Sequence, residues 1–261
     1  MNLKYKFLAV VCGLNVAFWV AASVYGHDAL TVDDVKSLLA ASSPAKPANL
    51  LKANLANFDL KGLDFRGANL AGANLFGAEL DGANLEGCNL EGANLDRAHM
   101  VQARLARARL RGASLLLTIL ADADLSGADM RGVTAIIIGP RIKLARANLS
   151  RAKLANDPSN QMMIELRSEF QSGDLSGANL EGADLSEALL ESAKLKSANL
   201  RDAKMVWSEL GSADFTGADV TGLDLSNANV WETKFICVKG ANKIKGLDTA
   251  RNRETAVFRC P

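Results

Sequence analysis

An apolar residue recurs at every fifth position along most of the chain. The series runs for 17 units over residues 50–130, for three units over 144–154 and for 13 units over 175–235, which gives 33 units. A period of five matches neither the roughly 3.6-residue turn of a helix nor the two-residue repeat of a strand, so the backbone must bend once in every unit. A fixed short period is typical of a solenoid, in which each unit buries its apolar side chains by stacking on its neighbours.

The positions around each apolar centre carry different residue types. A small residue, usually alanine, stands two places before the centre, and Asn or Asp stands between them, as in Ala68-Asn69-Leu70. Glycine often follows the centre by two places, as at Gly72, where it permits a tight turn. Hydrophobic residues make up 49% of the chain but aromatic residues only 5%. We therefore expect a narrow interior built from Leu and Ala.

The segments GANLAGANL at residues 67–75 and SGANLEGADL at 176–185 strongly resemble the pentapeptide-repeat proteins. The resemblance extends over most of residues 48–235 and recurs dozens of times. It implies an all-β solenoid, a right-handed quadrilateral β-helix with four pentads per coil and with the centre residue and the preceding alanine both inside. The 33 units then correspond to about eight coils of β-strand spacing.

The N-terminus has the parts of a secretory signal peptide. Lys4 and Lys6 precede a mostly apolar run at residues 7–22, and small residues follow up to Gly26. We expect a signal peptide at residues 1–26, cleaved before His27, and an exported protein in the periplasm or an equivalent extracytoplasmic compartment. An uncleaved membrane anchor is the alternative, because the apolar run falls just short of a comfortable span. After cleavage no stable membrane span would remain.

Loss of the signal peptide would leave three cysteines, Cys88, Cys237 and Cys260. In an oxidising compartment we expect a disulfide between Cys237 and Cys260, because both lie in the short C-terminal segment. Two unpaired thiols are the alternative.

The remaining segments give the domain organisation. Thr31 is placed to cap a helix whose first turn is acidic and whose Val35, Leu38 and Leu39 share one face. We expect, in order, an N-terminal helical cap at 27–47, a solenoid at 48–154 with a register slip at 131–143, a helical insertion at 155–172, a second stretch of solenoid at 173–235, and a C-terminal cap at 236–261.

Two interruptions break the five-residue period. In the insertion, Met163, Leu166 and Phe170 follow helical spacing, so we expect a helix that packs its apolar stripe on a flank of the solenoid. The alternative is an amphipathic element that binds a partner. The run at 135–140 predicts a second irregular loop, and irregular loops are where function concentrates in a repetitive scaffold.

Five arginines lie within about one coil: Arg97, Arg104, Arg107, Arg109 and Arg111. They could receive an anionic partner such as phosphate, an acidic glycan or a lipid head group. Stacking at 20-residue intervals instead places Arg104 beside Asp124, Arg109 beside Asp129 and Arg111 beside Glu91, which favours ion pairs between coils. Arg97 and Arg107 are then the least obviously paired, and they are candidate interface residues.

A series of asparagines and two tryptophans are also expected to face outward. Asn54, Asn74 and Asn94 are 20 residues apart and are expected to form a side-chain ladder rather than a sugar site. Trp207 occupies an outward position of its pentad and is a candidate interface residue, whereas Trp231 is expected to pack at the C-terminal cap.

The composition of the chain disfavours nucleic-acid binding, metal binding and catalysis. The chain has 30 Lys and Arg against 29 Asp and Glu, a net charge of +1, which suits neither non-specific nucleic-acid binding nor anionic mimicry of DNA. With only His27 and His99 there is little material for a multi-histidine metal site or a catalytic triad. We expect no catalytic, metal or cofactor residues.

The sequence therefore predicts a non-enzymatic, exported pentapeptide-repeat protein that acts as a rigid protein-interaction or structural module. The expected partner is a protein, and self-association through the solenoid ends is possible. Family resemblance offers one alternative, a DNA-mimicking inhibitor of a type II topoisomerase, which the export signal and neutral charge disfavour. Another is an extracytoplasmic carbohydrate-acting β-helix enzyme, for which the mature chain has few aromatic platforms.

Overall fold

The computed structural model describes residues 30–155 and 166–260. The predicted signal peptide lies outside these residues, as does Met163 of the predicted helical insertion.

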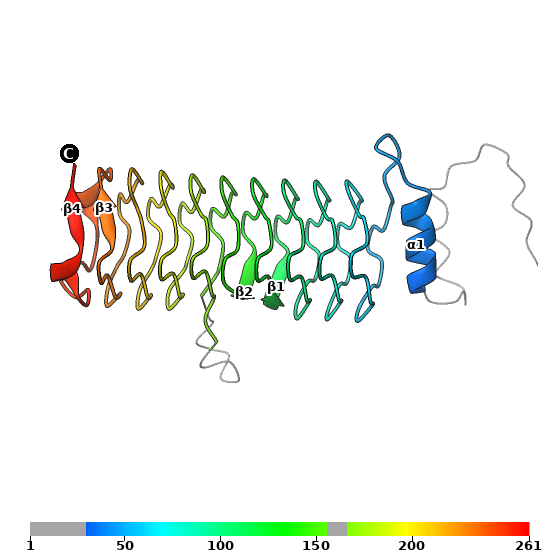
Figure 1. Ribbon diagram of the computed structural model, residues 1–261, viewed down its shortest axis with the longest axis horizontal. Coiled ribbons are helices and arrows are strands. Elements are labelled where there is room, and N and C mark those ends of the chain that lie inside the picture. Colours follow the sequence, from blue (N-terminus) through cyan, green and yellow to red (C-terminus); the bar gives the residue numbers. More distant parts are fainter. Residues whose placement is uncertain (1–29, 156–165, 261) are drawn as a thin grey trace, which may run out of the picture.

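The chain winds into a rod of stacked coils (Figure 1). Parallel backbone bridges join residues 20 positions apart, beginning with Asn49 to Asn69, Asn54 to Asn74, Asp59 to Glu79 and Asp64 to Asn84. Four bridged residues therefore make one coil, and the bridges form four columns along the rod. One column consists of Asn49, Asn69, Asn89, Arg109, Asp129, Asn148, Asn179, Asn199, Asp219 and Lys239.

Each pentad is fixed by the same few contacts. Leu70 and Ala73 point inward and are fully buried. The amide of Leu70 donates to the carbonyl of Asn89 on the next coil at 2.7 Å, and the amide of Ala73 donates to the carbonyl of Leu70 at 3.0 Å, which closes the turn. The period of five follows, because two inward side chains and one tight turn complete each unit. The prediction that Leu and Ala build the interior is confirmed.

The N-terminal end is covered by helix α1, Val32–Ala40. Thr31 and Asp34 form a capping box, in which the Thr31 amide donates to the Asp34 carboxylate at 2.9 Å and the Asp34 amide donates to the Thr31 hydroxyl at 3.2 Å. The predicted cap residue is confirmed. The predicted apolar face is only partly buried, because Val35 is buried while Leu38 is 36% exposed.

The register slip lies between two paired strands. Strand β1, Ser114–Ile119, pairs in parallel with β2, Thr134–Ile138, and Leu117 of β1 has no partner because β2 is one residue shorter. The irregular loop predicted at 135–140 is therefore wrong for its first four residues, since the isoleucines continue the coil as a strand.

Gly139 ends the shortened strand in a conformation open only to glycine. Its φ is 128°, and a Cβ there would lie 2.5 Å from the Ala121 backbone nitrogen. Its amide donates to the Glu169 carboxylate at 3.0 Å, which joins this corner to the following coil. The slip is thus absorbed within one corner, and the bridges resume at Lys143 opposite Asp124.

The prediction that Phe170 lies on the stripe of a helical insertion is wrong. Phe170 is fully buried as a pentad centre, and Glu169 bridges Leu189 on the next coil. The buried hydroxyl of Ser168 donates to the Leu154 carbonyl at 2.6 Å and so joins the two sides of the interruption. The solenoid therefore resumes before residue 173.

The segment expected as a C-terminal cap continues the coil pairing. Lys239, Lys245 and Arg251 extend three of the bridge columns, and β3, Lys234–Ile236, pairs in parallel with β4, Val257–Arg259, in the fourth. Two 3-10 helices, Ala241–Lys243 and Arg253–Thr255, form corners of this coil. Each column has ten levels as a result, more than the eight expected from the pentads.

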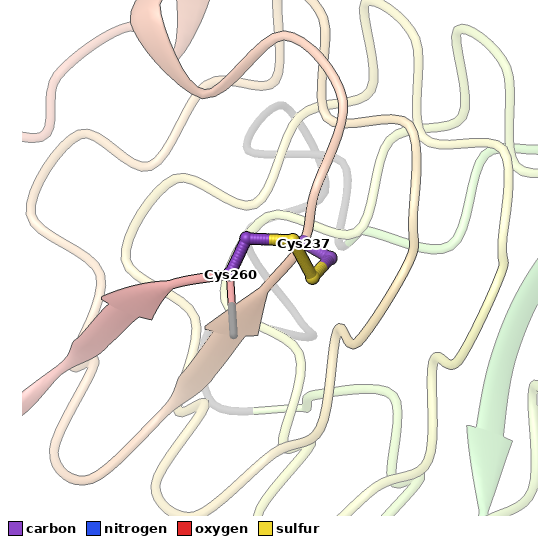
Figure 2. Close-up of a disulfide and its surroundings, with 2 residues drawn as sticks. All are labelled: Cys237 and Cys260. Atoms are coloured by element: carbon purple, nitrogen blue, oxygen red, sulfur yellow. A yellow bond between two sulfur atoms is a disulfide. The ribbon is translucent and has the colours of Figure 1, made fainter.

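A disulfide fastens the last coil. Cys237 and Cys260 follow β3 and β4 directly, and their sulfur atoms are bonded as predicted (Figure 2). Beside them the ring of Phe235 stacks between Phe215, at 4.9 Å between centroids, and Phe258, at 4.6 Å. The disulfide and the stacked rings together hold the terminal strand onto the rod.

Candidate functional site

The residues predicted as interface candidates occupy corners of the rod. Arg97, Arg107 and Trp207 each stand two places after a pentad centre with φ of 58–59°, so their side chains project from the turns. They lie at different corners or levels, and the structure does not bring them together as one site.

Arg107 is paired, contrary to the sequence prediction. Its guanidinium forms an ion pair with Glu86, a carboxylate that Arg104 also approaches, at 3.7 Å. Arg97 instead lies with its guanidinium carbon 5.8 Å from the centre of the Phe76 ring, within the range of a cation–π contact. Neither side chain stands unengaged in solvent.

The ion pairs between coils run to different partners from those predicted. Arg104 and Arg109 do bridge Asp124 and Asp129 through their backbones. Their side chains turn toward the preceding coil, however, where Arg109 donates to Glu91 at 2.7 Å. Within the described residues Arg111, predicted to pair with Glu91, forms no ion pair.

The carboxylate of Asp129 is taken by Arg131, two residues along the same pentad. Arg131 Nε lies 2.7 Å from Oδ1 of Asp129, and Nη2 lies 2.5 Å from Oδ2. This hydrogen bonding lowers the pKa of Asp129 despite the opposing effect of burial, and Arg111 contributes a smaller lowering.

A hollow of about 410 Å³ lies along the corner near these residues. It is lined by Arg111, Arg131, Gly132, Ser150, Arg151, Asn179 and Glu181. Sequence reasoning missed Arg131 and Arg151, although both continue the 20-residue spacing from Arg111. The 20-residue spacing could have identified these two arginines. The register slip between Arg131 and Arg151 offsets their side chains, and the spacing does not show that offset.

A second, smaller hollow of about 310 Å³ surrounds Trp207, whose side chain is 53% exposed as predicted. Its other lining residues are Arg167, Glu187, Glu209 and Arg251. Arg251 donates to Glu209 at 2.7 Å, so the charges beside the indole ring are partly neutralised. Trp207 offers a flat apolar surface with a polar rim.

Trp231 differs from Trp207 in its packing. A Cβ placed on Gly211 would lie 3.6 Å from Trp231 Cε3, so the indole ring rests where Gly211 has no side chain. Although 47% exposed, the ring packs near the last coils. This contact is with the preceding coil rather than with residues 236–261, so the expected packing at the cap stays a prediction.

The predicted asparagine ladder is confirmed. The side-chain amide of Asn74 donates to the Asn54 oxygen at 2.9 Å, and that of Asn94 donates to the Asn74 oxygen at 3.5 Å. These amides are used within the ladder, which argues against a sugar site there.

Cys88 takes an inward alanine position. Its thiol donates to the Phe65 carbonyl at 2.8 Å, and burial raises its pKa to about 12. A thiol held protonated in this way is a poor nucleophile and metal ligand. Cys88 therefore acts as a core residue.

Two further properties concern the described residues as a whole. No three His, Cys, Asp or Glu side chains in residues 30–155 and 166–260 gather closely enough to hold a metal ion. No helix in the same part of the chain is long and apolar enough to cross a membrane.

The sequence model of a family described as pentapeptide repeats matches this chain in eight copies, over residues 48–87, 78–115, 98–134 and 174–211. These matches lie on the regular coils of the rod. No curated protein matches the sequence.

Solved structures that the chain resembles include HetL, a pentapeptide repeat protein involved in heterocyst differentiation regulation from the cyanobacterium Nostoc sp. strain PCC 7120. The identity is 26%, the TM-score is 0.39, and the match covers 87% of this chain and 94% of HetL. A trypsin-treated form of QnrB1, a plasmid-mediated fluoroquinolone resistance protein, matches at 19% identity and TM-score 0.39, over 70% of this chain and 89% of QnrB1. A pentapeptide repeat protein from the Arabidopsis thaliana thylakoid lumen matches at 27% identity and TM-score 0.30, over 42% of this chain and 76% of its own.

Proposed function

This chain belongs to the pentapeptide-repeat family, and from that premise we propose that it is an exported, non-enzymatic rigid module that binds another protein. We further propose that its coils have the right-handed, quadrilateral form that the family implies. The observation that supports the role most directly is the fixed register of the outward side chains. Each outward column is held by a bridge at every coil, so a partner meets side chains whose spacing does not change on binding.

Trp207 is the side chain best suited to anchor a protein partner. Trp207 is more than half exposed, and four charged residues, Arg167, Glu187, Glu209 and Arg251, line the hollow around it. An aromatic side chain surrounded by polar groups is typical of the centre of a protein–protein interface.

The proposed compartment is the periplasm or its equivalent. The disulfide between Cys237 and Cys260 supports this location, because structural disulfides persist mainly in oxidising compartments. Fractionation of cells that express the full chain tests the proposal. The protein should leave with the periplasmic fraction, with Cys88 as the only alkylatable cysteine after denaturation without reductant. Recovery in the cytosol with three or more alkylatable cysteines would contradict it.

The partner is sought by crosslinking in intact cells. A photo-crosslinking amino acid placed at Trp207 should capture a discrete protein, identified by mass spectrometry. Ser197 is a matched control site, because it is also an exposed corner residue with positive φ but lies at a different corner. Equal capture from both positions, or capture from neither, would argue against a partner at Trp207.

The same preparations test the two other functional classes. Inhibition of DNA supercoiling by a cytosolic form would favour the topoisomerase alternative. Turnover of an acidic or neutral glycan, abolished by substitution of particular carboxylates, would favour an enzyme.

A further inference from the structure

The rod carries its charge in separate regions. Residues 97–155 contain eleven Lys and Arg but only three Asp, a net charge of +8, whereas residues 49–96 contain three Lys and Arg against seven Asp and Glu, a net charge of −4. The overall charge of +1 therefore hides a strongly basic middle. A field of this sign raises the local concentration of anions.

Ion pairs neutralise part of this basic region. Arg104, Arg107, Arg109, Arg131 and Arg141 each pair with a carboxylate. Among the described residues, Arg111 and Arg151 have no such partner, and both line the 410 Å³ hollow. Arg97, Lys143, Arg146 and Lys153 of this region also have no ion pair among the described residues, but they do not line the hollow. The hollow therefore brings together two of the six unpaired cations.

Backbone hydrogen bonds fix the order of residues along the hollow. The Gly112 amide donates to the Arg131 carbonyl at 3.1 Å, which places Arg131 on the coil after Arg111. The Gly132 amide donates to the Ser150 carbonyl at 3.2 Å, which places Ser150 one coil further. Asn179 and Glu181, which also line the hollow, belong to the coil after Ser150. With about 4.8 Å between coils, the hollow therefore spans four successive levels.

The register slip determines the shape of the hollow. Without it, Arg151 would lie directly after Arg111 and Arg131 in a single column of like charges. The shortened strand β2 moves Arg151 to the corner instead, where φ is 57°, and puts the small Ser150 in the column. A Cβ at Gly132 would meet nothing within 4 Å, so the space beside Ser150 stays open.

The hollow retains unused hydrogen-bond donors. Arg131 spends Nε and Nη2 on Asp129, which leaves its Nη1 group available. Ser150, half-buried at the centre, has a hydroxyl, and Arg111 and Arg151 are exposed arginines. Of the two other polar lining groups, the Asn179 oxygen accepts from Asn199 at 3.0 Å, and Glu181 lies 3.3 Å from the same amide, turned toward the following coil.

Glutamates stand in the same column on both sides of Arg111, Arg131 and Ser150. Glu91 precedes Arg111 by one coil, and the Arg151 amide donates to the Glu181 carbonyl at 2.9 Å, which places Glu181 one coil beyond Ser150. A long polyanion lying along the rod would run into one of these carboxylates. The ligand must therefore be a compact anion.

We propose that Arg111, Arg131, Ser150 and Arg151 bind a phosphate monoester. A phosphate monoester carries up to two negative charges and three terminal oxygens, so it can accept from several guanidinium groups at once. A single carboxylate has one charge and two oxygens and would satisfy one arginine. The phosphate belongs to a small soluble molecule or to a lipid head group, which present the same chemistry. The inference goes beyond the proposed protein-binding role and does not depend on it.

The test is a titration of the full oxidised chain with inorganic phosphate at low ionic strength, followed by NMR. We expect saturable shifts at Gly132, Ser150 and Arg151. Arg111→Gln and Arg151→Gln should each weaken the affinity at least tenfold, and Arg151→Lys by an intermediate factor because lysine lacks the guanidinium fork. Arg151→Gly should also abolish saturable phosphate binding. This variant should fold normally, because Gly132 and Gly182 hold the same corner position on the adjacent coils.

Arg146→Gln is the matched control. Arg146 is also an exposed corner residue with positive φ on the same coil, and it lacks an ion pair within the described residues, but it does not line the hollow. It should change the affinity less than twofold. Equal loss from Arg146→Gln and Arg151→Gln would overturn the proposal in favour of the general field of the basic region, as would binding that does not saturate.

Vesicles distinguish the two sources of phosphate. Co-sedimentation with phosphatidylcholine vesicles containing phosphatidic acid, and its loss in Arg151→Gln, would assign a lipid head group. Saturable binding of inorganic phosphate without co-sedimentation would assign a soluble phosphate compound. Preferential binding of DNA or of a sulfated glycan, insensitive to Arg151→Gln, would overturn the proposal. None of these outcomes depends on whether Trp207 captures a protein.

Discussion

The N-terminal coils, residues 49–96, and the middle coils, residues 97–155, have the same interior and opposite exteriors. Leu85 and Leu125, one from each region, are both completely buried at pentad centres. The outward positions differ, with a net charge of −4 in the first region and +8 in the second. The inward residues therefore determine the path of the chain, and the outward residues can vary without changing it.

The two regions are joined where their charges meet. Glu86 and Glu91 lie near the end of the acidic region. They form ion pairs with Arg104, Arg107 and Arg109 on the next coil. Four predictions test whether the two regions have equivalent interiors and whether their outward charges can change without disturbing those interiors.

The largest effect is expected inside the rod. Leu85→Ala and Leu125→Ala should each lower the free energy of unfolding by about 3 kcal/mol, because each removes buried methyl groups and leaves a cavity. Chemical denaturation followed by circular dichroism measures both. A markedly smaller loss in one region would show that the two interiors are not equivalent.

The corner at the slip should be less tolerant than a regular corner. Gly139→Ala should cost about 3 kcal/mol, because the new Cβ would collide with the Ala121 backbone at a φ of 128°. Gly87→Ala should cost about 1 kcal/mol, since φ is 66° and nothing lies within 4 Å of its Cβ. The same denaturation experiment compares them, and equal losses would mean that the slip imposes no special constraint.

A matched pair of carboxylates tests the exteriors through pH. Arg131 lowers the pKa of Asp129, and Arg66 lowers that of Asp64 in the same way, in both cases chiefly by side-chain hydrogen bonding. A carboxylate whose pKa is lowered by folding stabilises the protein above its unfolded pKa of 3.8 and loses that effect as the pH falls through the folded value.

Asp129→Asn should therefore cost about 1 kcal/mol at pH 6, and the difference from wild type should shrink below about pH 4. Asp64→Asn should cost less, because the Asp64 side chain is 49% exposed and that of Asp129 only 25%. Thermal unfolding between pH 7 and pH 2 measures both variants. A cost for Asp129→Asn that does not change with pH would contradict an ionic origin.

The smallest effect is expected at the junction. Glu86→Gln should cost about 0.5 kcal/mol or less, because Arg104 and Arg107 are largely exposed to solvent. The cost should disappear in high salt, which screens exposed charges. Glu187→Gln is the control, an exposed glutamate without an ion pair in the described residues. A loss above 1 kcal/mol for Glu86→Gln alone would make the junction a structural requirement.

Two sources predicted the regular features from the sequence: the five-residue period, and the four pentads per coil that the family resemblance implied. The buried Leu and Ala positions, the asparagine ladder from Asn54 to Asn94 and the bridge between Arg104 and Asp124 all follow from pentads stacked at 20-residue intervals. The capping helix was predicted from local chemistry, since Thr31 and Asp34 satisfy each other at its first turn.

The misassigned features depend on contacts that periodicity does not specify. Phe170 matched a helical spacing with Leu166, but burial on the adjacent coil decided its place. Ion-pair partners were set by how long side chains turn, so that Arg109 contacts Glu91 rather than Asp129. The arginine hollow was missed because one missing residue in β2 offsets Arg151 from Arg131.

The four bridge columns give insertions and deletions a directional meaning. Adding or removing 20 residues would change the length of the rod and leave every later side chain over its old column, whereas a five-residue change would turn all later coils by one face. The one-residue shortening of β2 does neither, since the columns realign at Lys143 and Lys153. The angle around the axis between Arg151 and Trp207 can therefore be reset in steps of one face, by pentads inserted between them, with no substitution at either residue.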